Sequence, residues 1–193
     1  HDAIAKLGLP AELVQMVPNP PSKLKTQKLM QLADLVVVTG SQSNVKAGYM
    51  SGTPAIGVGA GNVVTIIDET ADLNDAATKI AASKTFDNAT SCSSENSLVV
   101  VEPIYDQMIA ALANAGGFLL NDEQSQLLQS VHWQNGKMTT TLLAQDIDKV
   151  LDATGLDKTA PNNTRFLILP QSDIGPEYPL TGEKMARFLS IHR

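Results

Sequence analysis

The only cysteine of the sequence, Cys92, lies among small polar residues in the stretch SKTFDNATSCSSEN, residues 83–96. A buried structural cysteine usually has apolar neighbours, whereas the hydroxyls here come from Thr90, Ser91, Ser93 and Ser94. A thiolate is a strong nucleophile near neutral pH, and a thioester formed on it still reacts with a second acceptor. From these residues alone, a reactive thiol and an ordinary thiol at Cys92 are about equally well supported.

The spacing around Cys92 resembles that of the CoA-acylating aldehyde dehydrogenases. This family carries a Ser-Lys-Thr-Phe-Asp-Asn run before its nucleophilic cysteine and a Ser-Glu pair after it, as residues 83–95 do here. The resemblance continues upstream through residues 38–40, 51–62 and 67–72. It implies an α/β fold of the aldehyde dehydrogenase type, with parts of two Rossmann-like open sheets and flanking helices.

The resemblance implies that Cys92 is the catalytic nucleophile of an oxidoreductase. In the family, the cysteine attacks a short aldehyde, the thiohemiacetal passes hydride to NAD or NADP, and the resulting thioester is released to coenzyme A. The developing oxyanion needs fixed donors, and the backbone N–H of Cys92 is implied to be one of them.

A missing carboxylate favours coenzyme A over water as the acyl acceptor. Hydrolytic aldehyde dehydrogenases carry a Glu-Leu-Gly-Gly motif whose glutamate activates water, and Gly57-Val58-Gly59-Ala60 stands in its place here. Without that general base, release to a thiol is favoured. Hydrolysis by a base elsewhere, and a non-catalytic module with an ordinary thiol, remain the alternatives.

Cofactor contacts are implied by the same resemblance. Thr39, Gly40 and Ser41 stand where the family presents a turn and a helix N-terminus to the dinucleotide, where backbone N–H groups favour phosphate. Gly57, Val58 and Gly59 are assigned to the cofactor site too, although the glycines could serve only as a tight turn. Glu183-Lys184 matches the Glu-Lys pair of the acylating branch, whose glutamate resembles the residue that holds the nicotinamide ribose. The Met-Ala-Arg that comes after this pair departs from the usual Leu-Ser-Pro.

Segments with helical spacing alternate with short β-branched runs, which is typical of an α/β domain with a largely parallel sheet. We expect strands at 35–38, 55–58, 63–67, 97–101, 165–169 and 188–191. We expect helices at 23–32, 44–50, 105–115, 122–130 and 146–154, and another after Asp72. The first strand is expected to be buried on both faces, and the Gly116-Gly117 pair to end a helix.

We expect residues 1–67 to be the C-terminal half of a dinucleotide-binding domain and residues 68–193 the N-terminal part of the cysteine-containing catalytic domain. The resemblance places further family elements on both sides, so the sequence is expected to be a piece of a longer chain. Whether this piece is active by itself stays open.

Composition narrows the partners. The net charge of −6 and the scattered Lys and Arg leave no basic stripe for nucleic acid. The apolar runs are far shorter than a membrane span, and a single cysteine favours a reducing, cytoplasmic setting. The three histidines lack a partner at metal-ligand spacing, so no metal site is expected.

The expected partners are therefore a small aldehyde and coenzyme A, with NAD or NADP as cofactor and homo-oligomers in the intact protein. The hydroxyl-rich surround of Cys92 resembles the sulfoacetaldehyde members of the branch. Acetaldehyde and succinate semialdehyde are the other candidates.

Overall fold

The computed structural model describes residues 2–193, which divide into two compact units between Ala60 and Gly61. This division differs from the one expected at residue 67. Strand β3 (Val63–Ile67) pairs in parallel with β4 (Glu95–Val100), so its hydrogen bonds place it in the second unit. The link between the units is therefore the short segment around Ala60, before β3.

The first unit contains short helices and a two-stranded parallel sheet of β1 and β2. Its elements are α1 (Asp2–Lys6), the 3-10 turn η1 (Ala11–Leu13), α2 (Lys23–Leu32), β1 (Val36–Thr39), α3 (Gln42–Tyr49) and β2 (Ala55–Val58). Both strands, α2 and α3 were predicted. Helix α3 begins two residues before the predicted start because the Ser41 side chain accepts a hydrogen bond from Asn44 N and caps it.

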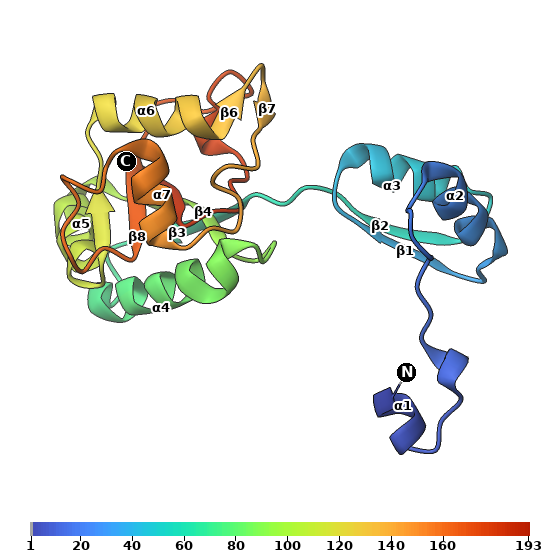
Figure 1. Cartoon of the computed structure of the whole chain (residues 1–193). Helices are drawn as coiled ribbons and strands as arrows, with labels where there is room; N and C mark the ends of the chain where they lie inside the picture. The colour runs from blue at the N-terminus through green and yellow to red at the C-terminus, as the bar shows by residue number, and fades with distance from the viewer. Residues whose placement is uncertain (1) are drawn as a thin grey trace. The chain divides into compact units, whose positions relative to one another are not determined.

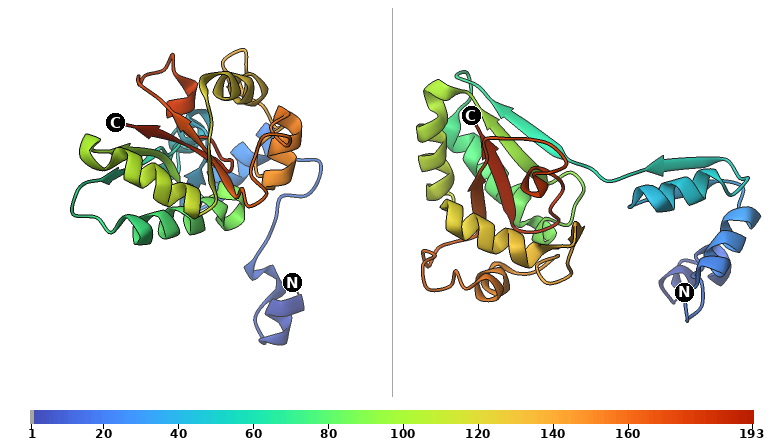
Figure 2. Two further views of the ribbon diagram at one scale, coloured as in Figure 1. Left: turned by 90° about the vertical axis from the view of Figure 1, so that its left-hand side faces the viewer. Right: turned by 90° about the horizontal axis from the view of Figure 1, so that it is seen from above.

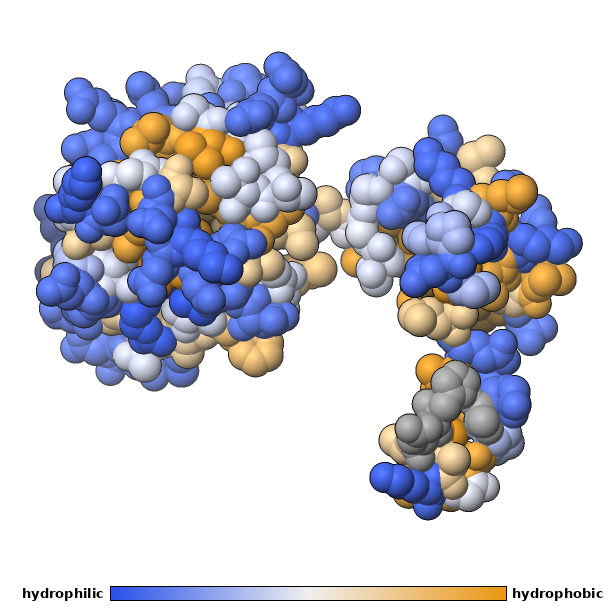
Figure 3. All heavy atoms as spheres, viewed as in Figure 1, coloured by the Kyte–Doolittle hydropathy of each residue, from blue (hydrophilic) through white to orange (hydrophobic). Residues whose placement is uncertain are grey.

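Helix α3 covers one face of this sheet, since a Cβ atom at Gly48 would touch the side chains of Val36 and Val38. The opposite face is open, and Val37 is 67% exposed. The prediction that this strand is buried on both faces is therefore wrong for the chain as it stands. Hydrophobic side chains of the first unit reach its surface (Figure 3), including the apolar residues of α2.

The second unit is a parallel sheet of five strands in the order β3-β4-β9-β8-β5. Its helices are α4 (Leu73–Thr85), α5 (Tyr105–Asn114), α6 (Asp122–His132) and α7 (Ile147–Thr154), with the 3-10 turns η2 (Phe86–Ala89), η3 (Glu102–Ile104) and η4 (Pro179–Thr181). The remaining strands are β5 (Gly117–Leu119), β8 (Phe166–Pro170), β9 (Phe188–His192) and the hairpin pair β6 (Trp133–Gln134) and β7 (Lys137–Met138).

Helices cover this sheet on both sides, with α4 and α6 on opposite sides (Figure 1). Alternate residues of β8 supply two separate cores because successive side chains of a strand point to opposite faces. Phe166 and Ile168 pack with α4 and α5, whereas Leu167 and Leu169 pack with α6 and α7. Figure 2 shows the strands from two further directions. The predicted α/β fold with a parallel sheet is confirmed.

The second unit follows the predicted helices and strands closely, except that neither the hairpin of β6 and β7 nor the strand β5 was predicted. Asp72 caps α4 by accepting hydrogen bonds from the backbone N–H groups of Asn74 and Asp75, and Ala77 and Ile80 of its predicted apolar face are buried. Gly117 was expected only to end a helix, yet it opens strand β5, which pairs with β8. A strand of three residues is too short to show a periodicity in the sequence.

Candidate active site

Cys92 is exposed on the loop between η2 and β4. Three consecutive residues before it, Asp87, Asn88 and Ala89, have left-handed backbone angles with φ of 47°, 51° and 60°. Such angles are uncommon outside glycine and cost free energy, so neighbouring contacts must hold them. The Thr90 hydroxyl lies 2.7 Å from the Asp87 carbonyl oxygen and 2.8 Å from its carboxylate, which fixes the turn that presents Cys92.

Two of the four hydroxyl residues around Cys92 bond to residues that precede the loop. Half-buried Thr90 bonds to Asp87, and buried Ser94 lies 3.5 Å from the Lys84 ammonium. Half-buried Ser91 and exposed Ser93 have their hydroxyls 2.9 Å apart. These two hydroxyls and exposed Cys92 therefore contribute polar groups to the surface of the loop.

Glu183 lies beside Cys92 with Gly61 between them. A Cβ atom at Gly61 would be 3.3 Å from the Cys92 carbonyl oxygen, 3.9 Å from Cys92 Cβ and 4.0 Å from Glu183 Oε1. Gly61 therefore lies next to both predicted site residues, without a side chain of its own to fill the space there. Gly61 was not among the predicted site residues.

The position of Gly61 near Cys92 and Glu183 could have been inferred from the predicted strands. Gly61 precedes β3, Cys92 precedes β4 and Glu183 precedes β9, and these strands are neighbours in the sheet. In a parallel sheet all strands begin at the same edge, so loops that precede adjacent strands meet there. This inference also requires the order of the strands in the sheet, which the sequence did not provide.

Two lysines lie buried next to this edge, and both side chains are 0% exposed. Lys84 donates to the Glu95 carbonyl at 2.8 Å, and burial lowers its pKa to about 8 although Glu95 opposes the shift. Lys184 donates to the carbonyls of Asn96 at 2.7 Å and Gly182 at 2.9 Å. Burial, and then the charge of Lys84, lower the Lys184 pKa well below its ordinary value.

His132 supports the loop that carries Glu183. Its Nε2 lies 2.9 Å from the Lys184 carbonyl oxygen, and the ring packs edge-on against Trp133 and Phe188. Burial lowers the His132 pKa to about 4, against the opposing effect of the hydrogen bond to Lys184. Neutral His132 therefore donates from Nε2 to this carbonyl.

The other predicted cofactor residues lie together in the first unit, at the carboxyl ends of β1 and β2. Gly40 N donates to the Val58 carbonyl at 3.2 Å, and the turn Thr39-Gly40-Ser41 leads into the N-terminus of α3. The carboxyl edge of a parallel sheet next to a helix N-terminus is a common position for a dinucleotide phosphate. Gly40 has a φ of 118°, which only glycine adopts readily.

Packing against α3 explains Gly57, the glycine of β2. A Cβ atom at Gly57 would lie 2.6 Å from Val45 Cγ1 and 3.0 Å from the Tyr49 ring, and one at Gly59 would collide with Gln42. Gly57 N also donates to the Tyr49 hydroxyl at 3.1 Å. Close helix packing is therefore sufficient to require glycine at position 57, whether or not a cofactor contacts it. At position 59 the end of the flexible Gln42 side chain can move away, so packing does not by itself require glycine there.

Known proteins were compared with the chain over both units. The sequence model of the aldehyde dehydrogenase family matches residues 1–154. A sulfoacetaldehyde dehydrogenase (acylating) of Cupriavidus necator is 49% identical over 193 residues, which are 100% of this chain and 39% of that protein.

Solved structures agree with this match. The acetylating aldehyde dehydrogenase from Geobacillus thermoglucosidasius superimposes with a TM-score of 0.91 at 33% identity, over 99% of this chain and 42% of the other. The propionaldehyde dehydrogenase of Rhodopseudomonas palustris with bound CoA and an acylated cysteine gives a TM-score of 0.85 at 28% identity, over 100% of this chain and 44% of the other.

The chain thus spans about two fifths of the length of these relatives. The family match covers most of both units, and the predicted resemblance is confirmed. The chain belongs to the aldehyde dehydrogenase family.

Proposed function

We propose that this chain carries the nucleophile of a CoA-acylating, NAD(P)-dependent aldehyde dehydrogenase, with Cys92 as the catalytic residue. The observation that carries the proposal is the exposed Cys92, which follows a left-handed turn, with Cys92 and the Glu183 carboxylate both next to Gly61. The acylated cysteine of the Rhodopseudomonas palustris relative supports the same chemistry.

The reaction joins one aldehyde, one coenzyme A and one NAD(P)+ into acyl-CoA, NAD(P)H and a proton. The Cys92 thiolate adds to the aldehyde carbonyl and forms a C–S bond, and we assign the backbone N–H of Cys92 as a donor to the developing oxyanion. NAD(P)+ supplies the acceptor for the aldehyde hydride. The thioester left on Cys92 then passes to the coenzyme A thiol, which frees the cysteine.

The residues of the first unit suit a dinucleotide. Thr39, Gly40 and Ser41 turn the chain at the carboxyl end of β1 into a helix N-terminus, where backbone N–H groups attract phosphate. Gly57 and Val58 end the neighbouring strand, Gly59 follows it, and Val58 is 57% exposed. In the second unit, Glu183 offers the carboxylate that would accept hydrogen bonds from the nicotinamide ribose.

Coenzyme A is the acyl acceptor that we propose, because no carboxylate stands at position 57 to activate water. The bound CoA of the Rhodopseudomonas palustris relative supports this choice. Hydrolysis, the alternative, would need a base elsewhere, and acid formed without coenzyme A would reveal it.

For the aldehyde we propose sulfoacetaldehyde over acetaldehyde and succinate semialdehyde. Ser91 and Ser93 place two hydroxyls next to the thiol, and hydroxyl donors suit the oxygens of a sulfonate. The Cupriavidus necator relative bears this substrate in its name. A sulfonate and a carboxylate differ in shape and in the number of oxygens, so the three aldehydes can be ranked by kcat/KM.

The setting of the intact protein follows from the chemistry. Among the described residues no helix is long and apolar enough to cross a membrane. We infer a cytoplasmic enzyme, because Cys92 must stay reduced to act. We also infer a homo-oligomer, which the mass of the full-length protein in solution would test, and small-molecule partners rather than nucleic acid.

The deciding experiment is to incubate the full-length protein with acetyl-CoA and separately with sulfoacetyl-CoA, quench in acid, and identify adducts by peptide mass spectrometry. We expect a thioester on Cys92 and none in Cys92→Ser, because a serine hydroxyl is a far weaker nucleophile. The relative rates of adduct formation rank the two acyl groups. A folded protein without any adduct would point to the hydrolytic or the non-catalytic alternative.

A further inference from the structure

The buried side chain of Lys184 joins the two loops that hold Cys92 and Glu183. Its Nζ donates to the Asn96 carbonyl at 2.7 Å, four residues after Cys92, and to the Gly182 carbonyl at 2.9 Å, one residue before Glu183. Its backbone N–H donates to Asn96 Oδ1 at 3.0 Å. Two of these hydrogen bonds connect the start of β4 with the loop before β9, and the third lies within that loop. We call this set the Lys184–Asn96 clamp.

Other bonds hold the same loop from the side of α6 and α7. The Lys184 carbonyl accepts from His132, and Ala144 N donates to the Met185 carbonyl at 3.1 Å. Asn88, on the turn before Cys92, donates from Nδ2 to the Ala144 carbonyl at 2.9 Å. The loops of Cys92 and Glu183 are therefore connected twice, once directly by the clamp and once through Ala144.

Burying the Lys184 amine between these two loops is energetically unfavourable. Lys184 is 0% exposed and, among the described residues, forms no ion pair with a carboxylate. Burying an ammonium without a counter-charge is unfavourable, and burial accordingly lowers the Lys184 pKa well below its usual range. An apolar side chain of similar length would fill the same volume equally well. The two carbonyls that Lys184 binds are thus the feature that requires an amine at this position.

We propose that Lys184 is a positioning residue that sets the Glu183 carboxylate relative to the Cys92 thiol for hydride transfer. This inference rests on the proposed function, in which Glu183 holds the nicotinamide ribose and Cys92 carries the acyl group. Hydride transfer needs both loops in register, whereas acyl exchange between Cys92 and coenzyme A uses only the loop of Cys92. Loss of the clamp should therefore separate the two half-reactions.

The test uses Lys184→Met in the full-length protein, which keeps the length of the side chain and removes both carbonyl bonds. Acylation of Cys92 by acetyl-CoA is followed by mass spectrometry, and hydride transfer by the loss of NADH absorbance when NADH is added to the preformed acyl-enzyme. We expect acylation within about twofold of wild type and hydride transfer slowed by about 10- to 100-fold, since small misplacements cost about this much.

Asn96→Ala tests the clamp without touching the lysine. It removes the acceptor for Lys184 N, so the same selective loss is expected, and Asn96→Asp, which keeps an acceptor oxygen, should restore most of the rate. If Lys184→Met fails to fold, as judged by circular dichroism, the two Asn96 variants decide the question.

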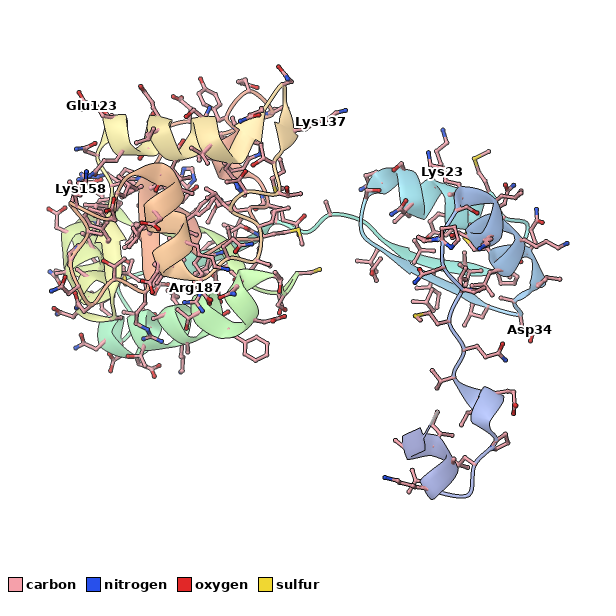
Figure 4. All side chains as sticks on the ribbon, viewed as in Figure 1. Lys23, Asp34, Glu123, Lys137, Lys158 and Arg187 are labelled. Carbon is pink, nitrogen blue, oxygen red and sulfur yellow. The ribbon has the colours of Figure 1, made fainter. Side chains whose placement is uncertain are left out.

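Two lysine variants serve as controls. Lys84→Met removes an equally buried lysine whose bonds stay within residues 84–95, so it should give no selective loss of hydride transfer. Lys158→Met removes an exposed lysine of the second unit (Figure 4) and should change neither half-reaction.

Equal loss in both half-reactions, or no loss in either, would overturn the role of Lys184. A wild-type protein that never acylates Cys92 would instead overturn the proposed function, and this inference with it.

Discussion

At the scale of single residues, the site depends on the absence of a side chain at Gly61. Gly61 has no side chain to separate Cys92 from Glu183, and a Cβ there would lie 3.3 Å from the Cys92 carbonyl oxygen. This is tighter than ordinary van der Waals contact, so the Cys92 loop would have to shift by a few tenths of an ångström. The position of the thiol is therefore sensitive to Gly61 although the residue takes no part in the chemistry.

Gly61→Ala in the full-length protein should lower the rate of Cys92 acylation by about tenfold, because the added methyl displaces the loop that carries the thiol. Gly61→Val should lower it further. The free energy of unfolding should change by less than about 1 kcal/mol for the alanine, because Gly61 does not have a left-handed φ. Rates come from quenched mass spectrometry and stabilities from urea titration. Normal acylation in Gly61→Val would show that this contact is irrelevant.

His132 makes the stability of the fold depend on pH. Its pKa is about 4 in the folded chain and near 6.5 when unfolded, so below pH 6.5 the unfolded chain binds a proton that the folded chain does not. Its contribution to stability is complete above pH 6.5 and is lost as the pH falls toward 4. The loss should amount to about 1–3 kcal/mol.

Urea midpoints measured between pH 7 and pH 4 test this, with His132→Gln as the reference because glutamine keeps a donor and does not titrate. The stability of wild type should fall more steeply over this range than that of the variant. Parallel curves would mean that His132 does not contribute.

At the scale of elements, the left-handed turns decide where helices stop and strands start. Gly116 has a φ of 96° between α5 and β5, and a Cβ there would meet Arg165 Cγ and Cδ at 2.8 and 2.7 Å. The turn thus combines a conformation that favours glycine with a close approach of the segment before β8.

Gly116→Ala should lower the free energy of unfolding by about 2–4 kcal/mol, the sum of a left-handed alanine and the contact with Arg165. Gly136→Ala is the matched control, since its φ is 70° but nothing lies within 4 Å of the new methyl. It should cost about 1–2 kcal/mol. Urea unfolding monitored by circular dichroism compares the two, and equal costs would show that the contact with Arg165 is relieved easily.

At the scale of the whole chain, the two units differ in how much apolar surface they bury. Within residues 2–60, Val36 and Val45 are the buried hydrophobic side chains of the described structure, whereas the second unit holds two clusters around its sheet. Stability follows buried apolar area, so the units should open with different free energies.

Hydrogen exchange of the 193-residue chain, followed by mass spectrometry, should show strands β4, β8 and β9 as the slowest to exchange. Peptides from residues 2–60 should exchange at least tenfold faster, because few contacts oppose local opening. Equal protection of β1 and β9 would contradict this view of the first unit.

The sequence by itself determined the order of the main elements, the parallel α/β class, the family and the choice of Cys92. These depend on local signals: β-branched runs, caps such as Asp72, and a motif of contiguous residues around the cysteine. The resemblance of Glu183-Lys184 to the family's Glu-Lys pair predicted Glu183, but not that it lies next to Gly61 as Cys92 does.

Only the tertiary structure decided which loops meet. Strand order brings Gly61, Cys92 and Glu183 to one edge of the sheet, and the Lys184–Asn96 clamp joins residues far apart in the chain. Whether the apolar faces of β1 and α2 are buried likewise depends on which neighbouring segments are present. A pattern of apolar residues shows that a face can be buried, but it does not show which segment covers that face. Non-local contacts carry no periodicity along the chain, which is why the clamp and the role of Gly61 could not be predicted from the residues alone.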